Sequence, residues 1–94
     1  MATAYETARA GGSHANFLRD YGALPDHLIE KALRSLGRQV ELHQAWIADP
    51  TAKLGGQFDR EYARRLVEQK WPKDILRQRE QIEILRGILR ERRK

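Results

Sequence analysis

Hydrophobic residues recur with a helical period along the last third of the chain, and the positions between them are almost all charged. Pro72 suits the first turn of a helix, where no backbone N–H is needed, and Asp74 is favoured near the positive end of the helix dipole. The pattern therefore predicts a helix that begins at Trp71 or Pro72 and buries one apolar stripe. The stripe consists of Ile75, Ile82, Leu85 and Leu89, flanked by Leu76, Ile84 and Ile88.

A second long amphipathic stretch precedes this one. Pro25 and Asp26 provide a helix start of the same kind, and the helix should end before Asp49, because the residue ahead of Pro50 is disfavoured in helical conformation. Its apolar face consists of Ile29, Leu33 or Ala32, Leu36, Val40, His43 and Ile47. An amphipathic helix is stabilised mainly by burial of its apolar face, so we expect the two long helices to pack together.

The remaining segments predict shorter elements. Residues 1–12 are small and polar, as in a flexible leader. Ser13 can cap a short helical turn that Gly22 stops, and residues 51–57 form a loop. Asp59 caps a medium helix, which Pro72 separates from the last one.

The expected fold class is all-α. Residues 13–94 form a single helical domain, a small helical bundle with two long antiparallel amphipathic helices and one medium helix. Gly87 lies inside the last helix, where glycine costs about 1 kcal/mol relative to alanine. The glycine therefore indicates either the close approach of another backbone or a tolerated defect.

Composition narrows the classes of protein. The 94 residues include no cysteine, which excludes a disulfide scaffold, a cysteine-ligated metal and thiol catalysis. No apolar run is long enough to span a bilayer, so we expect no stable membrane insertion, and the N-terminus lacks the apolar region of a secretion signal. A net charge of +5 favours a polyanionic partner, nucleic acid first and an acidic protein or anionic membrane second.

Two histidines are the candidates for acid–base chemistry. His43 lies on the apolar stripe of its helix, either as a proton-transfer group or as a core histidine hydrogen-bonded to the backbone or to Trp71. His14 can reach the same region if the N-terminal turn folds back, and is otherwise a solvated loop residue. Two imidazoles with nearby cations can cleave RNA without a metal, one ring taking the 2′-OH proton and the other protonating the leaving group.

Cationic and aromatic residues complete the expected substrate site. Lys31, Arg34 and Arg77 are the candidate phosphate contacts, and Trp71 is either a neighbouring aromatic contact or a core residue. No histidine or acidic spacing typical of a metal site is present, and no glycine-rich nucleotide fingerprint occurs, so we expect no metal and no cofactor.

Spaced residues along most of the chain carry a family resemblance. They are residues 29–36, Gln39, residues 41–43 and 47–50, then residues 70–75 and 78–82. This pattern resembles the C-terminal tip domain of bacterial polymorphic toxins of the Rhs and contact-dependent-inhibition types. The resemblance implies a toxin, typically one that cleaves nucleic acid, together with a cognate immunity protein as partner. It also implies that Met1 marks a cloning boundary or the start of an orphan module.

These observations lead to one leading function and two alternatives. The leading expectation is a toxin module acting on nucleic acid, RNA rather than DNA, as a metal-independent ribonuclease in interbacterial competition. A secretion system would deliver it into the cytoplasm of a target bacterium, and it would be cytoplasmic when expressed alone. One alternative is a non-catalytic helical protein-interaction module, such as an adaptor, immunity-like or inhibitor protein. The other is a small DNA-binding protein that reads DNA with residues 59–70.

Overall fold

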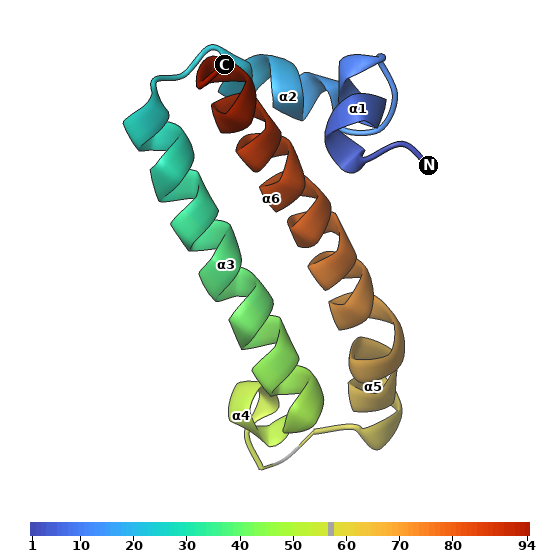
Figure 1. Ribbon diagram of the computed structural model, residues 1–94. Coiled ribbons are helices and arrows are strands. Elements are labelled where there is room, and N and C mark those ends of the chain that lie inside the picture. Colours follow the sequence, from blue (N-terminus) through green and yellow to red (C-terminus); the bar gives the residue numbers. More distant parts are fainter. Residues whose placement is uncertain (57) are drawn as a thin grey trace.

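The computed structural model describes residues 1–56 and 58–94, and within them every regular element is a helix. This confirms the predicted all-α fold class. In chain order the helices are α1 (Ala4–Arg9), α2 (Ala15–Gly22), α3 (Asp26–Ala48), α4 (Thr51–Leu54), α5 (Arg60–Arg65), the π-helical segment η1 (Leu66–Lys70) and α6 (Trp71–Arg92). Figure 1 shows α3 and α6 as two long rods lying side by side, with α1 and α2 at one end and α4 and α5 at the other.

The antiparallel pairing of α3 and α6 is the frame of the molecule, as the two apolar stripes predict (Figure 1). Pro25 is the N-cap of α3, and Asp49 follows its last residue, so both predicted ends are confirmed to within a residue. Arg92, the last residue of α6, binds the segment that connects α2 to α3. Its guanidinium donates to Asp26 Oδ1 at 2.6 Å and to the backbone oxygens of Gly22 and Leu24 at 3.0 and 2.6 Å.

The medium helix and the last helix are continuous, so the predicted break at Pro72 is wrong. Residues 60–92 form one helical run of 33 residues. Proline removes one helical hydrogen bond, and its ring clashes with the carbonyl of the residue four positions earlier. A wider turn relieves this crowding, and the N–H of Trp71 bonds to the oxygen of Leu66, five residues back, as a π-helix requires.

The flexible leader predicted for residues 1–12 is also wrong, because these residues include a packed helix. Thr3 and Glu6 form a reciprocal capping box at the start of α1. Tyr5 and Ala8 are buried against α6, and the Ala4 N–H donates to Glu83 Oε2 at 3.3 Å. The Tyr5 side chain packs directly on Gly87, so the glycine marks a close approach, but of a side chain and not of another backbone.

Short elements differ from prediction at two further places. The N-cap of α2 is His14, in the left-handed conformation with φ 67°, rather than Ser13. Residues 51–54 form a single turn of helix where a loop was expected, because the Asp49 side chain accepts from the N–H and hydroxyl of Thr51. The end of that expected loop, Gln57, lies outside the described residues. Asp59 caps α5 as predicted, accepting from the Glu61 N–H at 2.8 Å.

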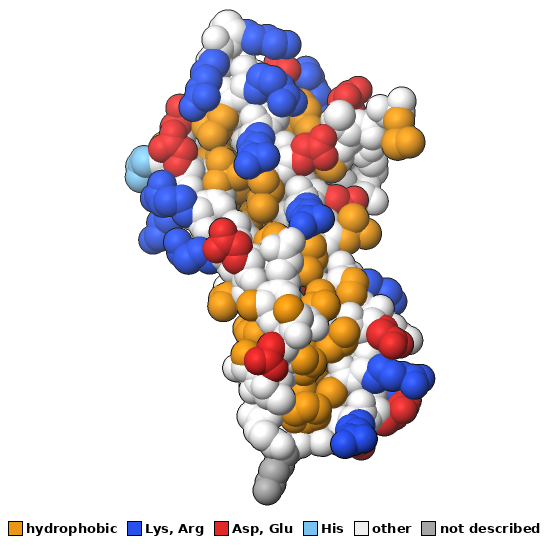
Figure 2. All heavy atoms as spheres, turned by 60° about the horizontal axis from the view of Figure 1, so that its bottom comes forward, with side chains coloured by type: hydrophobic (Ala, Val, Ile, Leu, Met, Phe, Trp, Pro, Cys, Tyr) orange, Lys and Arg blue, Asp and Glu red, His pale blue; other side chains and the backbone are white. Residues whose placement is uncertain are grey.

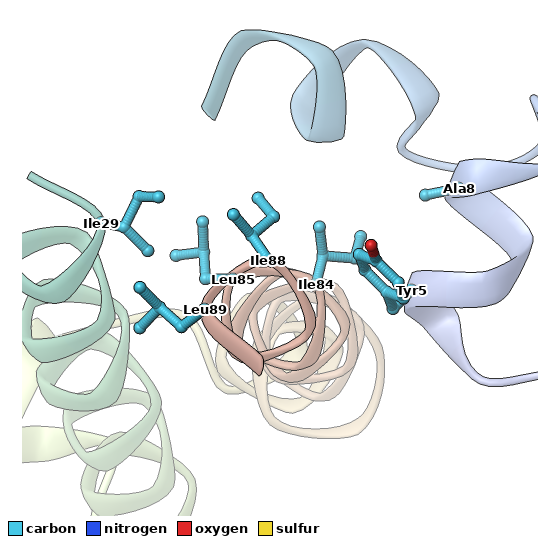
Figure 3. Close-up of a cluster of buried hydrophobic side chains, with 7 residues drawn as sticks. All are labelled: Tyr5, Ala8, Ile29, Ile84, Leu85, Ile88 and Leu89. Carbon is cyan, nitrogen blue, oxygen red and sulfur yellow. The ribbon is translucent and has the colours of Figure 1, made fainter. Parts of the chain in front are cut away.

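The main hydrophobic core lies where α1, α2 and α3 pack against the C-terminal half of α6. Ile29, Ile84 and Leu85 have no more than 2% of their surface exposed. Figure 3 shows Ile29 approaching from α3 on one side of α6 and Tyr5 and Ala8 from α1 on the other. In the part of the chain that the structure covers, no helix combines the length and the apolar character that crossing a bilayer requires.

Candidate functional site

His43 lies in the contact between α3 and α6, beside the segment Trp71–Arg77, as its place on the apolar stripe predicts. Only 8% of the residue is exposed. Its Nδ1 is 2.7 Å from the backbone oxygen of Gln39, and its Nε2 is 3.4 Å from Asp74 Oδ2. Both ring nitrogens therefore face acceptor oxygens of the protein itself.

Aromatic rings close the other side of the imidazole. The Trp46 ring lies 4.8 Å from that of His43 and 5.7 Å from that of Trp71, measured between centroids. Trp71 is only 3% exposed. A buried indole offers no face for a substrate to stack on, so the structure corrects its predicted role as a substrate contact and gives the core alternative instead.

Asp74 has three side-chain partners, two of them cationic. Besides His43, its carboxylate is 3.3 Å from Lys70 Nζ and 3.3 Å from the Arg77 guanidinium, while its own side chain is 13% exposed. Arg77, predicted as a phosphate contact, is thus paired within the protein. It lines a hollow of about 540 Å³ with Arg65 and Lys73, so the surface beside Asp74 is cationic.

The two histidines are not brought together, which corrects the predicted acid–base pair. His14 Nε2 is 3.3 Å from Glu80 Oε1, on the side of α6 that α1 and α2 cover. His43 meets Asp74 on the side that faces α3. Asp74 and Glu80 are six positions apart, which corresponds to about 9 Å along the helix axis and to a rotation of about 120° around it. One substrate phosphate cannot contact both rings in this arrangement.

Lys31 and Arg34 are exposed on α3, far from His43. They precede it by 12 and 9 residues, or about 18 and 14 Å along the helix. Lys31 and Arg34 therefore do not form one site with His43, whereas Arg77 lies beside it through Asp74.

His43, Asp74 and Gln78 form a buried polar layer between α3 and α6. Gln78 is 5% exposed, and its Oε1 has no hydrogen-bond partner among the described residues. A neutral imidazole donates through one nitrogen only, and here both nitrogens already face oxygens that a substrate would have to displace. Within the fold, the His43 and Asp74 side chains link α3 to α6.

Replacing Gln78 with methionine should stabilise the protein. Methionine has a similar length and leaves no buried polar atom without a partner, so we expect the free energy of unfolding to rise by about 1–2 kcal/mol. Denaturant unfolding of Gln78→Met beside Gln69→Met, at an exposed position of η1, measures the difference. Destabilisation of Gln78→Met would mean that the amide has a partner in solution.

A shallow groove runs along one side of the α3–α6 pair, opposite the side that α2 covers. It consists of three hollows of about 450, 500 and 340 Å³. The first two share Arg86, and the second and third share Gln44 and Arg79, so the three hollows follow one another along the helix pair. Figure 2 shows hydrophobic side chains in patches down this face, between basic and acidic ones.

The floor of the α3–α6 groove repeats every seven residues. Each hollow contains an apolar residue from each helix at this spacing: Leu33 with Leu89, Val40 with Ile82, and Ile47 with Ile75, the last joined by Pro72 and Leu76. Sequence reasoning missed this surface, although the seven-residue spacing within each stripe was a visible signal. The pattern alone assigns both stripes wholly to the contact between the two helices, whereas in the structure one edge of each stripe faces the groove.

The rims of the groove carry opposite charges. Glu83 of α6 also lines the middle hollow, and its carboxylate accepts from the Ala4 N–H. The basic rim consists of Arg79, Arg86 and Arg90 on α6 and Arg93 directly after it, and the acidic rim, on α3, consists of Glu30 and Glu41. No ion pair joins any of these six side chains to another residue within 1–56 and 58–94, whereas Lys70, Arg77 and Arg92 of the same C-terminal run are paired.

No group of three or more histidine, cysteine or acidic side chains suited to a metal ion occurs in the described part of the chain. Comparison with known proteins gives no family model, no curated relative and no solved structure that matches this chain. The class of protein must therefore be inferred from the geometry of its helices and surfaces.

Proposed function

We propose that this chain is a non-catalytic helical protein-interaction module that binds its partner through the α3–α6 groove. The observation that supports the proposal is a row of three adjacent hollows with an apolar floor, whose rim charges form no ion pair with any described residue. Apolar floors flanked by charged rims are what helical partners bind, with apolar anchors at helical spacing. The polar layer around His43, by contrast, is closed by its own partners.

Photo-crosslinking tests the groove as an interaction surface. Benzoylphenylalanine in place of Gln44, which lines two of the hollows, should give a covalent adduct of defined mass when cells expressing the chain are irradiated. The matched control places the same group at Arg38, an exposed position of α3 that lines none of the hollows. No adduct at Gln44, or equal adducts at both positions, would overturn the proposal.

The ribonuclease hypothesis predicts a different result in an RNA cleavage assay, so it can be tested separately from the interaction module. Because both nitrogens of His43 are held by the protein and His14 lies on another side of α6, we expect no cleavage of total RNA by the purified chain in EDTA. RNA integrity on a denaturing gel measures this. Cleavage that survives EDTA and is lost in His43→Ala would restore the toxin-nuclease hypothesis and contradict a non-catalytic module.

A further inference from the structure

The two rims of the α3–α6 groove define what a partner must carry. It needs acidic groups where it lies along α6 and basic groups where it lies along α3, with apolar residues between them. A single acidic helix would satisfy the basic rim and be repelled by Glu30 and Glu41. Nucleic acid would meet the same two carboxylates and would leave the apolar floor without a contact.

This chain itself meets all three requirements. Its α3 presents the acidic rim, its α6 presents the basic rim, and the floor between them is apolar. We propose that the occupant of the groove is a second copy of this chain, so that two α3–α6 pairs meet face to face as a four-helix bundle. The proposal rests on the proposed function, because it takes the groove as the interaction surface.

The symmetry of the pairing follows from the positions of the charges. A two-fold axis parallel to the helices places α6 of one copy beside α3 of the other, antiparallel and at the same level. Within one chain, Arg79 and Glu41 line the same hollow, so they are near one level of the bundle. The axis therefore brings Arg79 of each copy near Glu41 of the other. An axis running across the helices would instead bring the two basic rims together.

The floor supports the same arrangement. Its three apolar layers repeat every seven residues, or about 10.5 Å along the helix. Helices with this repeat pack knobs into holes at crossing angles near 20°, the geometry of four-helix bundles. The groove floor of the second copy has the same repeat, so the apolar residues of all three layers can interdigitate at the same time.

Light scattering during size-exclusion chromatography of the purified full chain tests the proposal, and we expect the mass of a dimer. Arg79→Glu and Glu41→Arg should each weaken the dimer by about tenfold or more, because each places like charges opposite one another at two symmetric positions. An equimolar mixture of the two variants should recover dimers, since each unlike pair then restores opposite charges. Arg38→Glu, which reverses an exposed charge outside the groove, is the matched control and should leave the dimer unchanged.

Circular dichroism confirms that each variant stays helical, so a fall in mass reports association rather than unfolding. A monomeric mass at about 1 mM, or a mixture that fails to recover dimers, would overturn the second copy as occupant. The crosslinking result separates the two proposals. An adduct at Gln44 with twice the mass of the chain supports both, whereas an adduct of another mass supports the interaction module and contradicts self-association.

Discussion

Replacing Asp74 with alanine is expected to lower the free energy of unfolding by about 2–3 kcal/mol, since removal of one partner strands a buried polar group. The carboxylate is 13% exposed, and it faces His43, Lys70 and Arg77 together. Without it the Nε2 of His43 loses its polar partner inside the contact between α3 and α6. Urea unfolding measures the change.

Asp20→Ala is the matched control for this variant. Asp20 also pairs with an arginine, Arg19, but both side chains are largely exposed, so we expect a change within about 0.5 kcal/mol. A double-mutant cycle with His43→Ala isolates the contact between the two residues. Strict additivity of the two substitutions would show that the imidazole and the carboxylate are not coupled, and would remove the polar layer as a stabilising feature.

Gly87→Ala is expected to destabilise the protein by about 1–3 kcal/mol, although alanine is the better helix former. A Cβ atom at this position would lie 3.0 Å from Tyr5 Cβ and closer still to the ring. The clash involves the base of the tyrosine side chain rather than its flexible end, so α1 has to move away from α6. Thermal and denaturant unfolding measure the loss.

Gly37→Ala provides the control with the opposite expected sign. Gly37 is also inside a long helix, but nothing lies within 4 Å of a Cβ built there. Helix propensity alone then applies, and we expect stabilisation by about 0.5–1 kcal/mol. A similar change in both glycine variants would contradict the close packing of Tyr5 on Gly87.

The sequence predicts the long helices well because each carries its own signals. Proline and acidic residues at the start of α3, a proline after its end and an apolar stripe act locally, and these signals agree with the structure. Pro72 is the exception. Its local meaning is a helix end, but a π-helical turn accommodates it, and no pattern within a single helix reveals this.

The candidate site was only partly predictable, because it depends on contacts between distant segments. The stripe placed His43 correctly against α6, but no spacing along the chain shows that Asp74 and Gln39 occupy both of its nitrogens. The position of His14 depends on how residues 1–12 fold. Their small and polar composition indicates a flexible segment, although it includes the capping box of α1.

The π-helical turn at residues 66–70 also sets which way α5 faces. A π turn holds one more residue than an α turn, which rotates everything before it by about 100° relative to an unbroken α-helix. That rotation lets Ala63 and Leu66 be buried while Trp71 and Ile75 point into the contact with α3. Shortening the segment by one residue would rotate α5 and turn Ala63 and Leu66 toward solvent. The length of this turn therefore determines whether the apolar residues of α5 and α6 can be buried together.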